Sequence, residues 1–504
     1  MFHVPTLDPN EMHWILVIAM SAIGCNYAKS AEAIHYAQPL HEFVRRAIMI
    51  ERQKNVLNCT PLWLMQAMIL NCIGLIHSGS PQSRDLGLSS FGELVRVAYR
   101  EDLFLTSNER KQDNDATSRP WKCWIDTETK RRTGYLVWLV GTTLAYTTDT
   151  PPLLTLKDVQ ETPLPAHESL WVANSEYVWQ SLYHQQENAP LGSALETLFI
   201  EKTLVPGIGE FSHVLLLHAL YQRLWEVGEY FQRPLSCWTP TADRKPRDSV
   251  LPSKAIWLPG LPIFSKWRNS ACDCLDTLHW SANGTIAKAA GLEHPTVLHL
   301  HAARLVLLVP FLEIRKLAMS LARQEISWEQ LDQASEWRPV WRWAKYDQHK
   351  ARLSIIHAGS VVWYVRRYST NAFHEPIAVF LATLTMWAYG LCRLHASQDQ
   401  HSKSSPSQSS HKRHAALDSA ATPTFIHLDR PCDDEIVQMF VRVGETMSGN
   451  VTGVGDICGP NGPSRILEEG IHILSGLVST WGIAHEYTDI LFRMGSQCAI
   501  PCSS

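Results

Sequence analysis

The sequence has no cysteine framework. Its 12 cysteines are scattered, the closest pairs are Cys272 with Cys274 and Cys498 with Cys502, and no C-x-x-C spacing occurs. A structural zinc site needs four converging ligands, usually a close cysteine pair followed by spaced histidines or cysteines. We therefore expect no metal site and no cofactor in this chain, and we expect reduced, mostly buried thiols in an intracellular protein.

An excess of positive charge is also missing, because 45 Lys and Arg residues stand against 49 Asp and Glu residues. This balance does not favour direct binding to nucleic acid, so we expect no DNA-binding residue in the chain. Uninterrupted hydrophobic runs are short as well. The run Trp14–Gly24 cannot cross a bilayer and follows the acidic Asp8 and Glu11. We interpret it as a buried helix, not an export signal, and expect a soluble chain without membrane contact.

The common catalytic motifs do not occur: there is no G-x-S-x-G elbow, phosphate-binding glycine loop, H-E-x-x-H helix or dinucleotide fingerprint. His294, His299 and His301 lie close together, but a two-residue step points the last two to different helix faces, so we expect ordinary histidines. Asp433–Glu435, with Asn174–Glu176 as a partial second motif, could hold magnesium for diphosphate chemistry. At a helix start, the same acidic residues simply favour the helix dipole.

What the sequence does have is helical periodicity along most of its length, punctuated by Pro and Gly. It predicts an all-α fold, a large irregular multi-helix domain without a fixed repeat. The predicted helices cover residues 10–29, 31–53, 61–79, 86–101, 121–147, 167–184, 190–203, 208–231, 262–282, 295–320 with a break at Pro310, 327–346, 349–371, 374–393, 432–448, 463–481 and 485–495.

Two polar stretches divide this pattern. The expected domain covers residues 1–396 with a disordered loop at about 105–120, and a Ser-rich disordered insert or linker follows at 397–424. Both stretches hold too few apolar side chains to offset the entropy of an ordered chain. Helices within 425–504 should then complete the same domain.

The stretch Glu128–Trp171 combines a helix with a proline-rich arm. Apolar side chains on more than one face indicate a central core helix. Residues 130–132 (KRR) near its start oppose the helix dipole, so we expect either solvent or an acidic partner such as Glu128 to hold them. Pro151-Pro152 then fixes an extended exit from the helix.

These residues carry a resemblance to a known family. The segment WIDTETKRRTGYLVWLV from Trp124, followed by PPLLTLKDVQETPLPAHESLW from Pro151, resembles the signature of the fungal-specific transcription factor domain, the all-α regulatory region of many fungal zinc-finger regulators. PLWLMQAMILN from Pro61 and IIHAGSVVWYVRRY from Ile355 are similar to the subgroup that follows paired two-cysteine two-histidine fingers. The chain differs at Val140–Thr142, where family members often carry an acidic residue.

The resemblance implies a structural role, without catalysis, for nine signature residues: Trp124, Arg131, Arg132, Trp138, Pro151, Pro152, Pro163, Pro165 and Trp171. It implies a nuclear regulator of RNA polymerase II transcription of metabolic or biosynthetic genes. Such a protein contacts DNA only through a zinc-finger module, which alone needs zinc and which we expect upstream of residue 1. A homodimer, a heterodimer with related regulators and a small-molecule effector are compatible with this resemblance.

Three hypotheses follow. The chain is the regulatory and dimerisation part of a zinc-finger transcription factor, or a finger-less regulator that acts through protein partners. The third hypothesis is an all-α, magnesium-dependent isoprenoid-diphosphate enzyme that uses Asp433 and Asp434.

Overall fold

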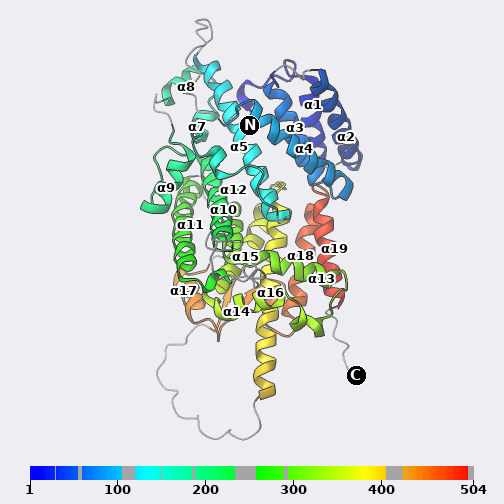
Figure 1. The fold of residues 1–504 in the computed structure, drawn as a ribbon, viewed down its shortest axis with the longest axis vertical. Coiled ribbons are helices and arrows are strands. Elements are labelled where there is room, and N and C mark those ends of the chain that lie inside the picture. The colour runs from blue at the N-terminus through cyan, green and yellow to red at the C-terminus, as the bar shows by residue number, and fades with distance from the viewer. Residues whose placement is uncertain are drawn as a thin grey trace, which may run out of the picture. The chain divides into compact units, whose positions relative to one another are not determined.

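The computed structural model describes residues 1–28, 30–54, 59–104, 120–148, 150–183, 188–232, 257–288, 293–403, 424–430 and 432–497. Helices dominate these ranges, as the sequence predicted (Figure 1). The chain divides into two compact units, Met1–Ala303 and Arg304–Ser504. The sequence prediction of one domain, 1–396 with an insert at 397–424 and completed by 425–504, stays a prediction.

The first unit contains most of the helices. Their bounds are α1 Trp14–Tyr27, α2 Ala31–Lys54, α3 Leu62–Ile76, α4 Pro81–Arg100, α5 Pro120–Thr148, α6 Leu156–Val159, α7 Glu168–Trp171, α8 Glu176–Leu182, α9 Leu191–Glu201, α10 Glu210–Gln232, α11 Pro262–Lys288 and α12 Pro295–Leu308, whose last residues pass into the second unit. Short 3-10 helices lie at Val4–Thr6 and Leu258–Gly260.

The core of the first unit lies around α3 and α5. The helix α3 is apolar on all sides and packs against α1, α2, α4 and α5, while α10 packs against α5, α9 and α11. In α5, Tyr135, Val137, Trp138 and Leu139 are all buried although they point in different directions around the helix. The helix therefore lies inside the unit, as its sequence predicted.

The second unit places its C-terminal helices and a small sheet around α16. Its elements are α13 Phe311–Ala322, a 3-10 helix at Trp328–Gln333, α14 Trp337–Tyr346, α15 Gln348–Tyr368, α16 Glu375–Lys403, β1 Phe425–His427, α17 Asp434–Val443, β2 Ser448–Val451, β3 Gly455–Asp456, α18 Gly462–Leu477 and α19 Ile483–Gln497. The helix α16 packs against α13, α14, α15, α18 and α19. The elements on both sides of the Ser-rich stretch therefore belong to one unit.

The three strands were not predicted, because runs of two to four residues are too short to show the alternation of a strand. In the sheet, β1 pairs parallel with β2 (Ile426 with Gly449), and β2 pairs antiparallel with β3 (Val451 with Gly455). The sheet backbone approaches α15 closely, since a Cβ atom at Gly359 would overlap the carbonyl of Leu428.

Two arginines of α15 hold the segment after the Ser-rich stretch. Arg366 contacts Asp429 and Glu469, each at 2.6 Å, and donates to the Thr452 carbonyl at 3.0 Å. Asp429 is only 1% exposed. At the other end of α15, Arg352 Nε donates to the Val441 carbonyl at 2.9 Å and so satisfies the C-terminus of α17.

Several predicted boundaries were wrong for identifiable reasons. The predicted helix 167–184 is two helices, because Ser175 accepts the Val178 N–H and starts α8 anew. The predicted helix 327–346 begins as a 3-10 turn with a capping box at Ser327 before α14. The predicted helix 432–448 ends at Val443, and the expected linker from residue 397 begins with the last turns of α16.

Other boundary predictions were confirmed or fall outside the described residues. The break at Pro310 separates α12 from α13, as predicted. Residues 105–119 and 404–423, which hold most of the two stretches predicted to be disordered, lie outside the described residues.

Among the described residues, one helix, α16, is long and apolar enough to cross a membrane, and the sequence analysis did not single it out. This window of α16, Glu375–Ala396, is 89% buried inside the protein. The bent pair α12–α13 also passes that test together, but its two helices meet at 86°. Because α16 is covered by other helices of the second unit, it serves there as the core helix.

Candidate functional site

A buried cluster of charged groups joins the start of α5 to the proline-rich arm. Glu128 Oε1 accepts hydrogen bonds from Arg132 Nε at 2.8 Å and from the Ala166 backbone N–H at 2.8 Å, and its Oε2 accepts from Arg131 Nη1 at 2.6 Å. Arg132 Nη2 donates to the Ala166 carbonyl at 2.6 Å. We call Glu128, Arg131, Arg132, Ala166 and Glu168 the arginine clamp.

The arginine clamp holds the basic residues Arg131 and Arg132 at the start of α5. The side chain of Glu128 is fully buried and that of Arg132 is 5% exposed, so both charges lie away from water. A buried ion pair is tolerated when each charge is paired and hydrogen-bonded, which is the case here. The acidic partner that the sequence analysis named, Glu128, is thus the residue that holds Arg131 and Arg132.

The arm that the clamp grips is kept extended by Pro163 and Pro165, both buried. Its free backbone groups pair with the segment before α9: the Leu164 N–H donates to the Ala189 carbonyl at 3.0 Å, and Asn188 donates to the Leu164 carbonyl at 2.9 Å. Proline fixes an extended backbone and donates no hydrogen bond. The arm therefore presents the Ala166 N–H and carbonyl to α5.

Glu168 connects the clamp to α10. Its carboxylate accepts the N–H groups of Glu210 at 2.7 Å and Phe211 at 3.1 Å, and lies 3.6 Å from Arg132 Nη2. A carboxylate at a helix N-terminus satisfies free N–H groups there. Burial, followed by the neighbouring Glu210 carboxyl, raises the pKa of Glu168 to about 7 against the opposing effect of Arg132.

Aromatic rings close the clamp from the other side. The Arg132 guanidinium lies 4.6 Å from the centre of the Trp171 ring, a cation–π distance. Trp124 packs at 6.4 Å from Trp171 and at 5.8 Å from Trp179. Trp138 lies further along α5, is fully buried in the core and is not part of this cluster.

The exit from α5 is tied down separately. Pro151 is exposed and Pro152 half-buried, and the chain turns inward after them at the fully buried Leu154. Gln222 of α10 donates to Thr142 Oγ1 at 2.7 Å and to the Leu154 carbonyl at 2.9 Å. The structure therefore brings together Trp124, Arg131, Arg132 and Trp171, while Pro163 and Pro165 position the arm and Pro151 and Pro152 lead out of α5.

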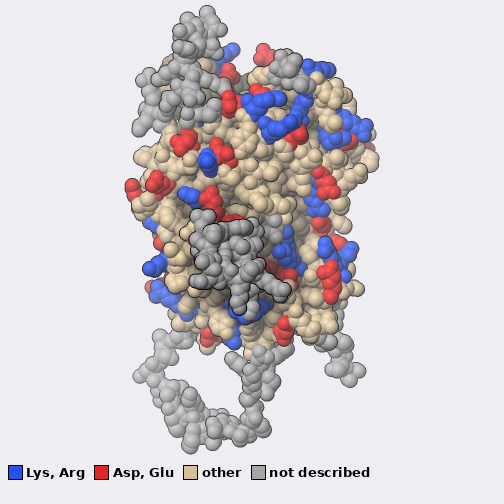
Figure 2. Space-filling view, viewed as in Figure 1, with Lys and Arg blue, Asp and Glu red and all other residues tan. Residues whose placement is uncertain are grey.

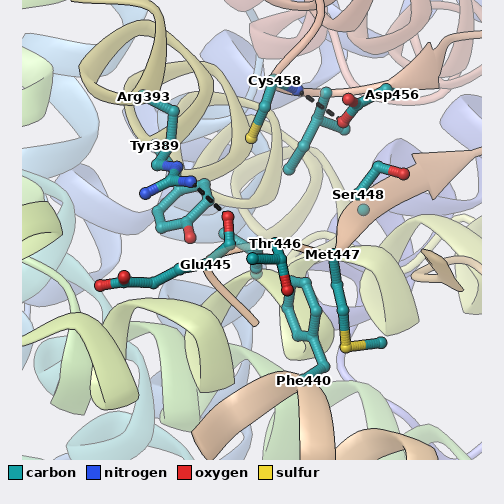
Figure 3. A pocket seen from close by; sticks show the side chains of 12 residues that line it. Tyr389, Arg393, Phe440, Glu445, Thr446, Met447, Ser448, Asp456 and Cys458 are labelled. Atoms are coloured by element: carbon teal, nitrogen blue, oxygen red, sulfur yellow. Dashed lines mark hydrogen bonds between the residues drawn. The ribbon is translucent and has the colours of Figure 1, made fainter. Parts of the chain in front are cut away.

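The second unit contains a cavity of about 220 Å³ between α15, α16, the end of α17 and the sheet (Figure 3). Arg393 reaches across it and donates to the Glu445 carbonyl at 2.8 Å, and the Cys458 N–H donates to Asp456 Oδ1 at 3.0 Å. Burial raises the pKa values of Tyr389 and Cys458, each to about 12. Both groups are uncharged at neutral pH, so Cys458 is not an activated nucleophile.

One carboxylate of the enzyme hypothesis, that of Asp433, acts as a helix cap. Asp433 Oδ1 accepts the Glu435 N–H at 2.8 Å and forms the N-cap of α17. Asn174–Glu176 starts α8 in the other unit. Within the described ranges, no three His, Cys, Asp or Glu residues are grouped as metal ligands. His299 packs against His218, and His301 against His279, with ring centres 5.8 and 5.6 Å apart.

Comparison with known proteins gives a family match for part of the chain. Residues 1–203 match the family model described as fungal specific transcription factor domain. The first 203 residues carry a fungal specific transcription factor domain. A transcription factor of Gibberella fujikuroi is 22% identical over 408 residues, which are 77% of this chain and 45% of that protein.

Two further relatives point the same way. The nicotinate catabolism cluster-specific transcription factor of Emericella nidulans is 22% identical over 77% of this chain and 45% of its own length. Zinc finger protein klf1 of Schizosaccharomyces pombe is 22% identical over 77% of this chain and 48% of its own length. The chain thus spans less than half the length of these relatives. No solved structure matches it.

The fungal specific transcription factor domain contains α5 and the whole arginine clamp, whereas the cavity of the second unit lies beyond the matched residues. On the face shown in Figure 2, basic and acidic side chains are interspersed among neutral ones, without a field of one sign. The described residues drawn on that face form no extended basic surface for a phosphate backbone.

Sequence reasoning missed some residues of both sites. Glu168 and Ala166 were not singled out, although a basic helix start with one nearby acid signals that another carboxylate comes from elsewhere in the chain. Tyr389, Arg393 and Cys458 come from distant segments and carry no motif, so the sequence held no signal for the cavity.

Proposed function

We propose that this chain is the regulatory part of a nuclear transcription regulator, and that a zinc-finger module outside the chain reads the DNA. The fungal specific transcription factor domain in residues 1–203 is the observation that carries the proposal. Two relatives support its details, since one is named as a zinc finger protein and the other as a transcription factor specific for a nicotinate catabolism cluster. We extend these to RNA polymerase II transcription of metabolic or biosynthetic genes.

The chemistry of the described residues agrees with a regulatory role. The buried carboxylates and arginines of the arginine clamp are paired with one another, with backbone groups and with an aromatic ring, so they hold elements together. A regulatory domain acts by shifting between packed states, and such states differ in contacts of this kind. The clamp joins α5, the arm and α10 by direct contacts, which is the arrangement that coupling between these elements would require.

The proposal also includes binding partners. The chain would associate with a second copy of itself or with a related regulator, and it would bind an effector that biases the packing of the helices. The cavity of the second unit, at about 220 Å³, suits only a ligand smaller than most drug-like molecules. Arg393 and Asp456 would give such a ligand one cationic and one anionic partner.

A tethering experiment tests the regulatory role directly. The full chain is fused to an unrelated DNA-binding module, and transcription of a reporter that carries sites for this module is measured. We expect output that differs from that of the module alone, and we expect Arg132→Met to reduce the difference at equal protein level. Output equal to that of the module alone would count against the proposal.

A further inference from the structure

The helix α2 has an apolar face that the described residues of the first unit leave about half exposed. Its inner face packs on α1 and α3 through buried residues such as Val44 and Ile48. On the outer side, Tyr36, Phe43 and Ile50 are 60%, 50% and 56% exposed. They follow one another at seven-residue steps, and so form one stripe along the helix. Figure 1 shows α2 at the rim of the first unit.

The stripe continues onto α1. The Trp14 ring lies 6.2 Å from the Phe43 ring and is itself 50% exposed. We call Trp14, Tyr36, Phe43 and Ile50 the α2 face. Single exposed apolar residues are common on protein surfaces, but an aligned set of aromatic and aliphatic side chains on a helix is typical of a helix-packing interface.

We propose that the α2 face binds the α2 face of a second copy of this chain, with the two helices antiparallel and Phe43 at the two-fold axis. In this register Tyr36 of each copy faces Ile50 of the other, because the two positions lie equally far on either side of Phe43. An isologous interface requires such self-complementarity. The α2 face is self-complementary in this sense, because its residues that meet in the antiparallel pair are all aromatic or aliphatic.

The charges of α2 favour the same arrangement. From Ala31 to Phe43 the helix carries two acidic and no Lys or Arg residues, whereas from Val44 to Lys54 it carries four basic residues and one acidic residue. Antiparallel pairing places the acidic half of one copy beside the basic half of the other. In the Phe43-centred register, Glu32 faces Lys54 of the second copy, whose ammonium also lies 3.0 Å from Glu51 of its own chain. Parallel pairing would place like charges together.

This inference deepens the proposed function and rests on it for its meaning, since dimeric regulators can engage two DNA half-sites. Its tests measure whether the purified chain is a monomer or a dimer. It can therefore fail while the tethering experiment succeeds, and the reverse is equally possible.

The first test is sedimentation velocity of the complete 504-residue chain over a concentration series. We expect a monomer–dimer equilibrium, with a dissociation constant raised at least about tenfold by Phe43→Glu, because the substitution buries two charges at the axis. Trp280→Glu is the matched control: Trp280 is 76% exposed in the same unit and outside the α2 face, and its replacement should leave the dimer intact. Circular dichroism verifies that both variants fold.

The second test probes the register. Glu32→Lys and Lys54→Glu should each weaken self-association about three- to tenfold at low salt, because each homodimer then holds two like-charge contacts. An equimolar mixture of the two variants, or the double variant, should restore the dimer. A chain that stays monomeric, a dimer insensitive to Phe43→Glu, or charge variants that do not rescue each other would overturn the proposal. A monomeric chain would leave the α2 face to another protein segment.

Discussion

Arg132 is the residue on which the arginine clamp depends. It contacts a fully buried carboxylate, a backbone carbonyl and the face of Trp171 at the same time. A lysine has neither the planar fork nor the reach to make these three contacts together. Two of the residues singled out in the sequence, Arg131 and Arg132, are therefore parts of one structural device that fixes the arm to α5.

Arg132→Met should lower the free energy of unfolding by about 3–5 kcal/mol, because it leaves Glu128 buried without its main partner. Arg131→Met is the matched control: the Arg131 side chain is 18% exposed and binds the same carboxylate, so its loss should cost about 1–2 kcal/mol. Urea unfolding followed by circular dichroism measures both. Equal losses for the two variants would show that the burial of Arg132 is not decisive.

Glu168 makes stability depend on pH. Its pKa in the folded protein, about 7, lies above the value of 4.5 expected for an unfolded chain. The folded state therefore binds the proton more tightly, and the free energy of unfolding should fall as the pH rises from about 4.5 to about 7. Glu168→Gln should flatten this slope, which denaturation at a series of pH values measures. An unchanged slope would assign the pH dependence to other groups.

At the level of elements, long helices were predictable and short ones were not. The all-round apolar α3 and the central α5 follow from periodicity, and the break at Pro310 follows from the missing N–H of proline. The division of 167–184 depends on a side-chain cap at Ser175, which the sequence permits but does not require. The contacts between the arm and α5 involve Glu168 and Ala166, and tertiary packing, not local sequence, sets these contacts.

The carboxylates at the start of α17, Asp433 and Asp434, could stabilise the helix or bind magnesium. Substitutions distinguish these two roles. Asp433→Ala should lower the free energy of unfolding by about 1 kcal/mol, because the Glu435 N–H loses its acceptor. Asp434→Ala, which removes no cap, should cost less. Thermal melting with and without magnesium and inorganic diphosphate measures both effects. A rise in Tm on adding the two ligands, lost in Asp433→Ala, would support the enzyme hypothesis instead.

At the scale of the whole molecule, two helical units with different candidate sites share one chain. The first carries the fungal specific transcription factor domain, the arginine clamp and the α2 face, and the second is organised around the buried α16 and contains the cavity. The sequence predicted the all-α class and the family from its motif blocks, but the two units arise from long-range packing that no local pattern records. The balanced charge of the chain agrees with a protein that reaches DNA through a separate module.

The proposal that a zinc-finger module reads the DNA is best tested by sequencing the native transcript upstream of the Met1 codon and translating it in the same frame. We expect paired two-cysteine two-histidine fingers there, joined to this chain in one open reading frame. An in-frame stop codon upstream of Met1, with no finger-coding exon before it, would contradict the account and leave a finger-less regulator that acts through protein partners.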